Sequence, residues 1–297
     1  MNILIVGSKG FIGTHCYNYF SHLAGYNSWG CDVVVDYTAD HYFLVDSSHS
    51  DYNEVFEKMS FDFCINCSGA ASVPDSFINP FRDFTLNVFT VGKILEAIRR
   101  YKPECKFINL SSAAVYGNPS ILPVKITANT HPLSPYGWHK LQSELLCKEY
   151  SHFFKIRTLN LRVFSAYGPG LKKQLFWDLY KKSKLPGKVN IYGTGNESRD
   201  FIHIDDLTQV IELAMAYGDF DGTVVNVANG GEVFLKDAVK LFLGYLDKDF
   251  VFSGEIKAGD PINWVADIST IKEWGYKSKM KIAQGLKDYI EWAKESD

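Results

Sequence analysis

The sequence has no long apolar run, no block of basic residues and no repeated or low-complexity segment. Its first apolar stretch, Ile3 to Val6, is too short for a signal-peptide core or a membrane span, and it stops at a glycine. A formal net charge of −3 without a Lys/Arg cluster is not typical of a protein that binds a nucleic-acid backbone. We therefore expect a cytoplasmic protein that binds small molecules and neither nucleic acid nor membrane.

Cysteine is also sparse. The 297 residues contain six cysteines, too few for the dense disulfide framework of a small secreted protein. Cys64 and Cys67 form a C-x-x-C pair, but no second Cys or His pair accompanies it. Several cysteines lie in apolar, strand-like runs, so we interpret them as buried thiols and expect no metal.

What the sequence does have is an alternation of short apolar runs with amphipathic stretches. The runs NILIV, FDFCINC, CKFINL and IRTLNLRVF are separated by segments with helical spacing of apolar residues. This rhythm is typical of βαβ units. We predict an α/β fold with a Rossmann-type doubly wound parallel sheet in residues 1–167. Residues 168–297 would mainly form a smaller C-terminal substrate-binding lobe, with an approximate boundary and a chain that can cross between the lobes.

The first strand runs into the loop GSKGFIG, which contains Gly7, Gly10 and Gly13. Glycines at a strand-to-helix turn let backbone N–H groups and the helix N-terminus approach a pyrophosphate. The spacing G-x-x-G-x-x-G differs from the commonest dinucleotide fingerprint, and a turn that only packs would explain the glycines equally simply. An acidic residue at the end of the next strand would favour the interpretation as a dinucleotide-binding loop.

An acidic residue follows at the end of that next strand, as ribose binding requires. Asp32 fits this role best, and Asp36 is the alternative. No Arg or Lys closely follows Asp32 to favour a 2′-phosphate, so NAD(H) is preferred to NADP(H), although Lys9 in the loop points the other way.

The stretch LSPYGWHK places Tyr136 and Lys140 four residues apart. Ser134 is a good N-cap and Pro135 a good first helical residue, so both side chains should share one helix face. An ammonium beside a phenol favours the phenolate, so we expect a lowered Tyr136 pKa. A chance pair on a helix surface is the alternative interpretation.

Further motifs follow in a fixed order: NCSGAASVPDS, then NLSSAAVYG with Ser111 and Ser112 at a strand end, then YGWHK, LRVFSAYGPG and SRDFIHIDD. This order resembles the extended short-chain dehydrogenase/reductases that modify nucleotide sugars, over nearly the whole chain. The resemblance implies that Ser112 holds the reacting sugar oxygen and that Tyr136 is the acid/base. Lys140 would lower the pKa of Tyr136 and bind the nicotinamide ribose.

The resemblance also implies which residues bind the NAD cofactor. They are Gly7, Gly10, Phe11, Ile12, Gly13, Asp32, Ser68, Gly69, Ala70, Asn87, Tyr136 and Lys140.

For the nucleotide-diphosphate sugar, the resemblance implies that Arg199 clamps the diphosphate, a task that suits a guanidinium. The alternative is a surface ion pair of Arg199 with Asp200 or Asp205. Two departures from the family pattern stand out. Ser165 replaces a frequent asparagine at a substrate-binding position, and AGDPINWVADIS lacks a frequent arginine, leaving Asn263 or Trp264 near that place.

Ala113 and Ala114 stand where sugar 4,6-dehydratases of the family carry an acid pair, which disfavours dehydration. We predict a nucleotide-sugar 4-epimerase that works through a 4-keto intermediate with retained NAD. The alternative is an NAD(P)H-dependent reductase of nucleotide 4-keto sugars. A non-catalytic NAD(H) sensor would not need Ser112, Tyr136 and Lys140 together.

Members of the family commonly form homodimers through two helices of each subunit. The matching segments are roughly residues 84–99 and 141–153. Phe89, Leu145 and Phe153 could serve either a dimer interface or the core of the subunit itself.

Overall fold

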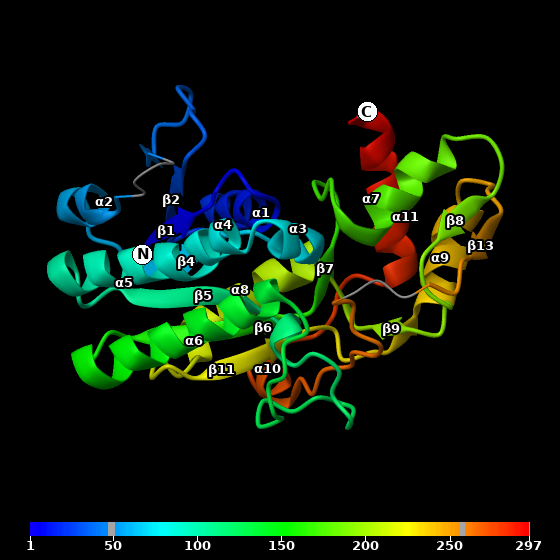
Figure 1. The fold of residues 1–297 in the computed structure, drawn as a ribbon. Helices are drawn as coiled ribbons and strands as arrows, with labels where there is room; N and C mark the ends of the chain where they lie inside the picture. Colours follow the sequence, from blue (N-terminus) through cyan, green and yellow to red (C-terminus); the bar gives the residue numbers. More distant parts are fainter. Residues whose placement is uncertain (47–50, 256–258, 297) are drawn as a thin grey trace.

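The structure is a computed structural model, which describes residues 1–46, 51–255 and 259–296. Its centre is a seven-stranded sheet with the strand order β3-β2-β1-β4-β5-β6-β11, in which all neighbours run parallel (Figure 1). The predicted doubly wound parallel sheet is confirmed. The strands are β1 (Asn2–Val6), β2 (Asn27–Asp32), β3 (Tyr42–Leu44), β4 (Phe63–Asn66), β5 (Lys106–Ser112), β6 (Thr158–Val163) and β11 (Val224–Val227).

Helices cover both faces of this sheet. One face carries α1 (Phe11–Ser21), α8 (Ile204–Tyr217) and α10 (Ser269–Glu273), and the other carries α2 (Asn53–Lys58), α5 (Thr90–Tyr101) and α6 (Pro135–Phe154). The short α3 (Val73–Ile78), α4 (Pro80–Phe84), π-helical η1 (Thr85–Phe89) and 3₁₀-helical η2 (Ala113–Val115) lie nearer the carboxyl ends of the strands.

Strand β1 shows why these layers form. Ile3 and Ile5 belong to one hydrophobic core, while Leu4 and Val6 belong to the core on the opposite face. Successive side chains of a strand point to opposite faces, so an uninterrupted apolar run fits only a strand that is covered on both sides.

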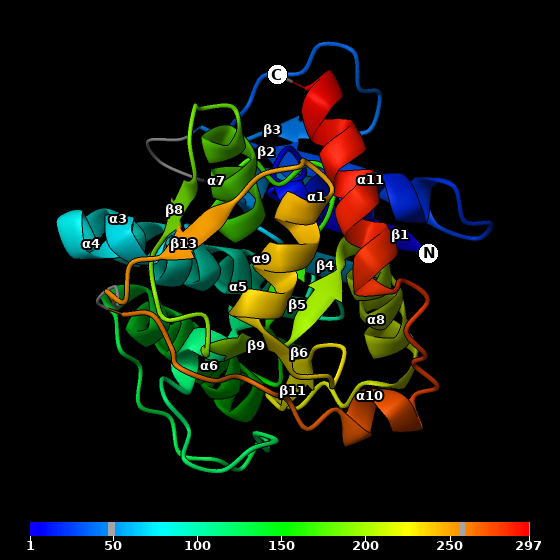
Figure 2. The same cartoon turned by 90° about the vertical axis from the view of Figure 1, so that its right-hand side faces the viewer.

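A smaller lobe stands beyond the carboxyl ends of the strands (Figure 2). Its core packs aromatic side chains, among them Phe176, Phe242 and Tyr289, which are all buried. Two-stranded pairs join its elements: β7 with β10, β9 with β12, and β8 with β13. The elements are β7 (Ser165–Tyr167), α7 (Gln174–Ser183), β8 (Val189–Ile191), β9 (Ser198–Arg199), β10 (Phe201–His203), β12 (Val233–Phe234), α9 (Leu235–Gly244), β13 (Phe250–Phe252) and α11 (Ile282–Glu295).

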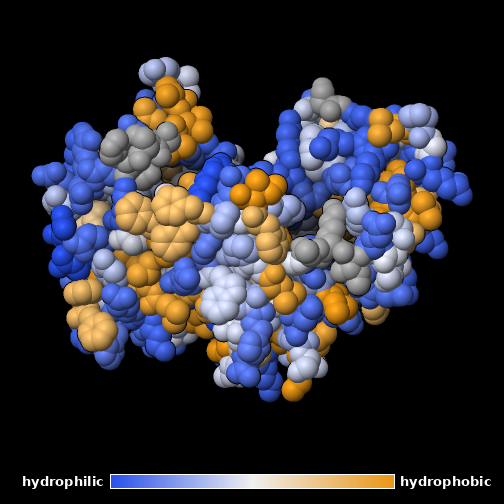
Figure 3. Space-filling view, viewed as in Figure 1, coloured by the Kyte–Doolittle hydropathy of each residue, from blue (hydrophilic) through white to orange (hydrophobic). Residues whose placement is uncertain are grey.

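The chain crosses between the two lobes more than once. Helix α8 and strand β11 return to the sheet, where Leu207 and Val227 are buried in the same core as β1. Residues 268–276 also return to the sheet, and Ile271 is fully buried in that core. The surface is hollowed between the lobes, beyond the carboxyl ends of the strands (Figure 3).

All six cysteine thiols are free, and all but Cys67 are buried, which confirms their interpretation as thiols of the core. In the part of the chain that the structure describes, no helix is long and apolar enough to cross a membrane.

Candidate active site

The glycine loop between β1 and α1 contains two glycines that packing requires. Gly7 has φ +79°, and a Cβ there would lie 2.7 Å from the Ser68 backbone nitrogen. A Cβ at Gly13 would lie 2.0 Å from the Gly7 carbonyl oxygen. Gly10 differs, because its Cβ would meet only that same carbonyl, at 3.2 Å. The loop thus leaves the N-terminus of α1 open beside Gly10, where a phosphate group can approach.

Asp32 lies at the end of β2 and reaches the same loop. Its Oδ2 accepts a hydrogen bond from the Lys9 backbone N–H at 2.8 Å, and its Oδ1 accepts one from the Val33 N–H at 2.7 Å. The Lys9 ammonium forms an ion pair with Asp36, which lowers the pKa of that carboxyl. The structure therefore separates the two acidic candidates: Asp36 neutralises Lys9, and Asp32 contacts the glycine loop.

Helix α6 begins as predicted. The Ser134 hydroxyl accepts a hydrogen bond from the Gly137 N–H at 3.2 Å, and Tyr136 follows in the first turn. A Cβ at Gly137 would lie 2.7 Å from the Ala114 carbonyl, so the helix sits close against the end of β5. This approach places Tyr136 beside Ser112, whose side chain lowers the pKa of the phenol.

Lys140 lies one turn further along, on the same side of α6. Its Nζ is 6.0 Å from the centre of the Tyr136 ring and donates to the Leu110 carbonyl at 2.9 Å. The side chain is only 6% exposed. The structure thus brings Ser112, Tyr136 and Lys140 together at the carboxyl end of β5.

The electrostatics of this group differ from the prediction. Burial raises the pKa of Tyr136 to about 12, the Asp83 carboxylate adds to the rise, and the hydrogen bond with Ser112 opposes it. Burial also lowers the pKa of Lys140 to about 8. The expected net lowering of the Tyr136 pKa is therefore wrong for this structure, because desolvation outweighs the stabilisation of the phenolate.

Gly69 and Asn87 meet Lys140 beside the end of β4. Gly69 has φ +118°, and a Cβ there would lie 2.5 Å from Asn87 Oδ1 and 3.5 Å from Lys140 Nζ. Both polar atoms of the buried Asn87 side chain lack a hydrogen-bond partner within the described residues. Asn87 sits in η1, and π-helical turns are often found at functional sites. Buried polar groups without partners fit a site that a polar ligand completes.

Ser68 and Ala70 flank Gly69. The Ser68 hydroxyl donates to Asn66 Oδ1 at 2.5 Å, so its position is fixed by the end of β4. These residues follow the strand next to β1, where the strand order reverses and where open α/β sheets bind their ligands.

Arg199 lies on β9, in the smaller lobe. Its Nη1 donates to the carbonyl oxygens of Ser198 at 2.8 Å and Ile262 at 3.1 Å, and its Cζ is 5.6 Å from the centre of the Trp264 ring. Burial lowers the pKa of Arg199, while the nearby Asp260 and Glu197 oppose this. These contacts hold the guanidinium among backbone carbonyls and an aromatic ring.

Neither acidic residue that was considered as a partner pairs with Arg199. The Asp200 carboxylate is fully buried and accepts backbone N–H groups, including those of Gly230 and Ala266. The Asp205 carboxylate lies 3.5 Å from His203 Nδ1. Ser165 is joined to the same region, because its N–H donates to the Asp200 carbonyl at 3.1 Å.

The structure adds a buried ion pair that the sequence analysis missed. Glu144 accepts two hydrogen bonds from Arg162, at 2.9 and 2.7 Å, and one from the Ser111 hydroxyl at 2.5 Å. Glu144 lies four residues after Lys140 on α6, so helical spacing could have identified it. Of the two adjacent serines, Ser111 thus anchors β5 to α6, and Ser112 faces Tyr136.

A second missed pair joins α4 to α6. His139 Nδ1 lies 2.6 Å from Asp83 Oδ2, and the Asp83 side chain is buried. His139 directly precedes Lys140, so this pair belongs to the surroundings of the site.

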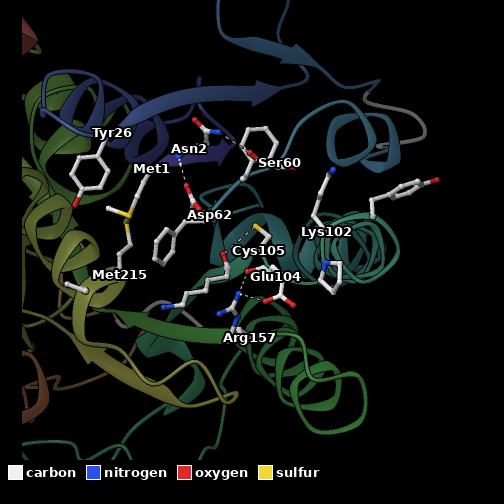
Figure 4. A pocket seen from close by; sticks show the side chains of 16 residues that line it. Met1, Asn2, Tyr26, Ser60, Asp62, Lys102, Glu104, Cys105, Arg157 and Met215 are labelled. Carbon is white, nitrogen blue, oxygen red and sulfur yellow. Dashed lines mark hydrogen bonds and ion pairs between the residues drawn. The ribbon is translucent and has the colours of Figure 1, made fainter.

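A cavity of about 750 Å³ lies at the opposite, amino edge of the sheet (Figure 4). Asn2, Asp62, Lys106 and Arg157, which stand at the starts of strands, contribute to its lining. None of the predicted site residues lines this cavity. Its size therefore does not identify the site of chemistry.

The parallel sheet, the glycine loop and the Ser-Tyr-Lys group together define an enzyme of the short-chain dehydrogenase/reductase class. A family model agrees: residues 3–228 match that of the NAD dependent epimerase/dehydratase family. The chain belongs to this family.

Individual relatives resemble the chain over its full length. A putative UDP-glucose 4-epimerase of Methanocaldococcus jannaschii is 26% identical, and the match covers 99% of both chains. A UDP-glucuronic acid 4-epimerase from Bacillus cereus, solved with UDP-glucuronic acid and NAD, is 26% identical with a TM-score of 0.89 over 100% of both chains. A UDP-glucose 4-epimerase from Thermotoga maritima, solved with UDP-glucose, is 26% identical with a TM-score of 0.86 over 100% of this chain and 99% of that one.

Proposed function

We propose that the protein is an NAD-dependent nucleotide-sugar 4-epimerase. The observation that carries this proposal is the convergence of Ser112, Tyr136 and Lys140 beside the open glycine loop. The family and the 4-epimerases among its relatives support the same reaction.

The residues present fit NAD. The N-terminus of α1 beside Gly10 would take the pyrophosphate, and Asp32 would accept hydrogen bonds from a ribose. Asn87 and Lys140 would bind near the nicotinamide, where the unpartnered Asn87 amide offers a donor and an acceptor. When bound, NAD supplies a hydride acceptor that takes the hydrogen of C4 and returns it to the other face of the keto sugar.

The chain's own groups move the proton. As C4 is oxidised, the C4 hydroxyl loses its proton to the ionised oxygen of Tyr136, and the Tyr136 phenol formed in this way gives the proton back when the keto group is reduced. The Ser112 hydroxyl lies beside the Tyr136 phenol and would hydrogen-bond the same sugar oxygen. A nearby ammonium such as that of Lys140 would favour the ionised phenol, whereas burial raises the pKa of Tyr136 in the chain alone.

Arg199 is proposed to bind the diphosphate of the substrate. Its guanidinium is held by carbonyl oxygens and a tryptophan ring rather than by Asp200 or Asp205, and a guanidinium can bind two phosphate oxygens at once. Ser165, half-buried on β7, would be a further contact.

The reaction is tested by incubating the purified protein with a panel of UDP-, GDP-, dTDP- and CDP-sugars and analysing the products by NMR. An epimerase brings the two C4 epimers to equilibrium without added reductant and without a lasting change in NADH absorbance. A 4-ketoreductase instead consumes one NAD(P)H per keto sugar and stops without it. No turnover with any sugar would leave the NAD(H) sensor as the better interpretation.

We further propose that the protein is a cytoplasmic homodimer that acts in carbohydrate biosynthesis. Phe89, Leu145 and Phe153 are 52%, 57% and 70% exposed, so they are not part of the subunit's own core. Apolar side chains gather over α4 and α5 on this side of the molecule (Figure 3). Exposed apolar surface of this kind supports association. Sedimentation of the wild type and of Phe153→Glu tests it, and a monomeric wild type would contradict it.

A further inference from the structure

The Asp83–His139 pair lies beside the active site and has an unusual environment. Asp83 is 3% exposed, and its Oδ2 accepts a hydrogen bond from the ring of His139 at 2.6 Å. Its other oxygen, Oδ1, has no hydrogen-bond partner within the described residues. A buried carboxylate is costly unless its charge is used or compensated. Here the ring of a single histidine hydrogen-bonds one oxygen, and the other oxygen has no partner within the described residues.

The helices that carry the pair pack against each other beside the proposed catalytic groups. Helices α4 and η1 both pack against α6, which carries Tyr136, His139 and Lys140. Asn87, four residues after Asp83, also has unpartnered polar atoms and lies beside Gly69 and Lys140. Asp83 at the end of α4 and Asn87 in η1 thus both carry unpartnered polar atoms on elements that pack against α6.

We propose that Asp83, held by His139, is a positioning residue that controls the charge of the Tyr136 and Lys140 pair. Its catalytic consequence rests on the proposed function, whereas its electrostatic action on Lys140 does not.

The charges that reach Lys140 support this assignment. Burial lowers the pKa of Lys140, and Asp83 is the largest of the groups that oppose this, ahead of Cys67 and Glu144. The same Asp83 charge raises the pKa of Tyr136, against the hydrogen bond from Ser112. Asp83 therefore keeps Lys140 protonated and at the same time makes Tyr136 harder to ionise. Removing its charge should lower both pKa values.

The test follows the titration of Lys140 directly, by NMR of protein labelled with ¹³C at the lysine side chains. The Lys140 signal is identified by its loss in Lys140→Met. In Asp83→Asn, we expect the Lys140 titration to move to lower pH by about one pKa unit, as for the loss of a nearby opposite charge. Asp75→Asn is the matched control, because Asp75 makes an exposed ion pair with Arg82 near the same helix. It should leave the Lys140 titration unchanged.

An unshifted Lys140 titration in folded Asp83→Asn would overturn the proposal. If that variant does not fold, Asp83→Leu combined with His139→Leu replaces both partners by apolar groups, which removes the charge without leaving an unpaired partner. The same downward shift is expected there, and its absence has the same consequence.

The catalytic arm measures the pH dependence of kcat with the sugar found to be epimerised. In Asp83→Asn, both limbs of the profile should move to lower pH with KM little changed, whereas a merely structural role would lower kcat at every pH without moving the limbs. A shifted Lys140 titration in a protein that epimerises no sugar would leave this inference standing and contradict only the proposed function.

Discussion

Polar groups at the amino edge and at the carboxyl edge of the central sheet differ in whether they have hydrogen-bond partners. At the amino edge, around the large cavity, the Asp62 carboxylate accepts the Asn2 N–H at 2.7 Å, and Arg157 pairs with Glu104 at 3.0 Å (Figure 4). At the carboxyl edge, the buried Asn87 amide has no partner within the described residues. The polar groups named at the cavity are paired, whereas the buried Asn87 amide keeps both of its polar atoms available.

This difference is a better guide to chemistry than the volume of a hollow. Polar groups that are buried without partners destabilise the chain, so they tend to be kept where a ligand completes them. The buried Lys140 ammonium also lies at this edge, where it donates to the Leu110 carbonyl and pairs with no carboxylate of the described residues, and burial lowers its pKa to about 8. Substitutions at the carboxyl edge should therefore change activity, stability and ligand affinity more than matched substitutions at the amino edge.

The largest difference is expected for the tyrosines. Tyr136→Phe removes the proposed proton acceptor while the ring and the helix remain, so kcat should fall by about 10²- to 10⁴-fold with NAD binding retained. Tyr26→Phe is the matched change at the amino edge, where Tyr26 lines the cavity, and kcat should stay near that of the wild type. Near-normal turnover in Tyr136→Phe would show that the proposed mechanism is wrong.

The lysines should differ in how stability depends on pH. Unfolded chains keep the Lys140 proton up to its ordinary pKa of 10.5, whereas the folded chain loses it near 8. Between these values the unfolded state binds more protons, so stability rises with pH. Relative to Lys140→Met, the wild type without nucleotide should gain roughly 3 kcal/mol between pH 7 and pH 11. Urea unfolding across this range measures the gain.

The control for this effect is Lys106→Met at the amino edge. The Lys106 ammonium lies 4.8 Å from the centre of the Phe220 ring in a partly exposed position. The difference in free energy of unfolding between Lys106→Met and the wild type should not change with pH in the way expected for Lys140→Met. Parallel curves for the two variants would contradict the contrast between the edges.

The arginines provide a third comparison. Arg199→Ala removes the proposed charge-assisted contact with the substrate diphosphate and should weaken substrate binding by about 1.5–3 kcal/mol, with little change in NAD affinity. Isothermal titration with both ligands measures the two effects separately. Arg157→Ala should alter neither affinity, and an unchanged substrate affinity in Arg199→Ala would remove Arg199 from the binding site.

The smallest effect is expected within the amino edge itself. Glu104 is 91% exposed and Arg157 40% exposed in their ion pair. Exposed pairs contribute little, so Glu104→Gln should change the free energy of unfolding by less than about 1 kcal/mol. A larger loss would mean that this edge depends on its charges more than its exposure suggests.

The residues that the sequence predicted are those with a local signal. Ser134 and Pro135 mark the start of α6, so the position of Tyr136 and Lys140 on one helix follows from a few adjacent residues. Gly7 and Gly13 were likewise visible, although the structure shows that packing requires them as well. The direction of the Tyr136 pKa was not predictable, because it depends on how much of the phenol the fold buries.

Contacts between distant segments gave no such signal. Asp83 and His139 are 56 residues apart, and Asp83 stands beside Arg82 in a stretch that is typical of a helix surface. The carbonyl of Ile262 reaches Arg199 from a segment 63 residues later. Nothing in either neighbourhood specifies the partner, since only the tertiary fold brings these segments together.

The position of strand β11 in the sequence determines whether a fragment of the first lobe can fold on its own. It is the last strand of the sheet, yet it comes from residues 224–227, after the chain has built part of the second lobe. A fragment cut at residue 167 would leave β6 with an unpaired edge and uncover the apolar residues that α8 protects. Such a fragment should aggregate rather than fold, and the two lobes should unfold in one cooperative transition.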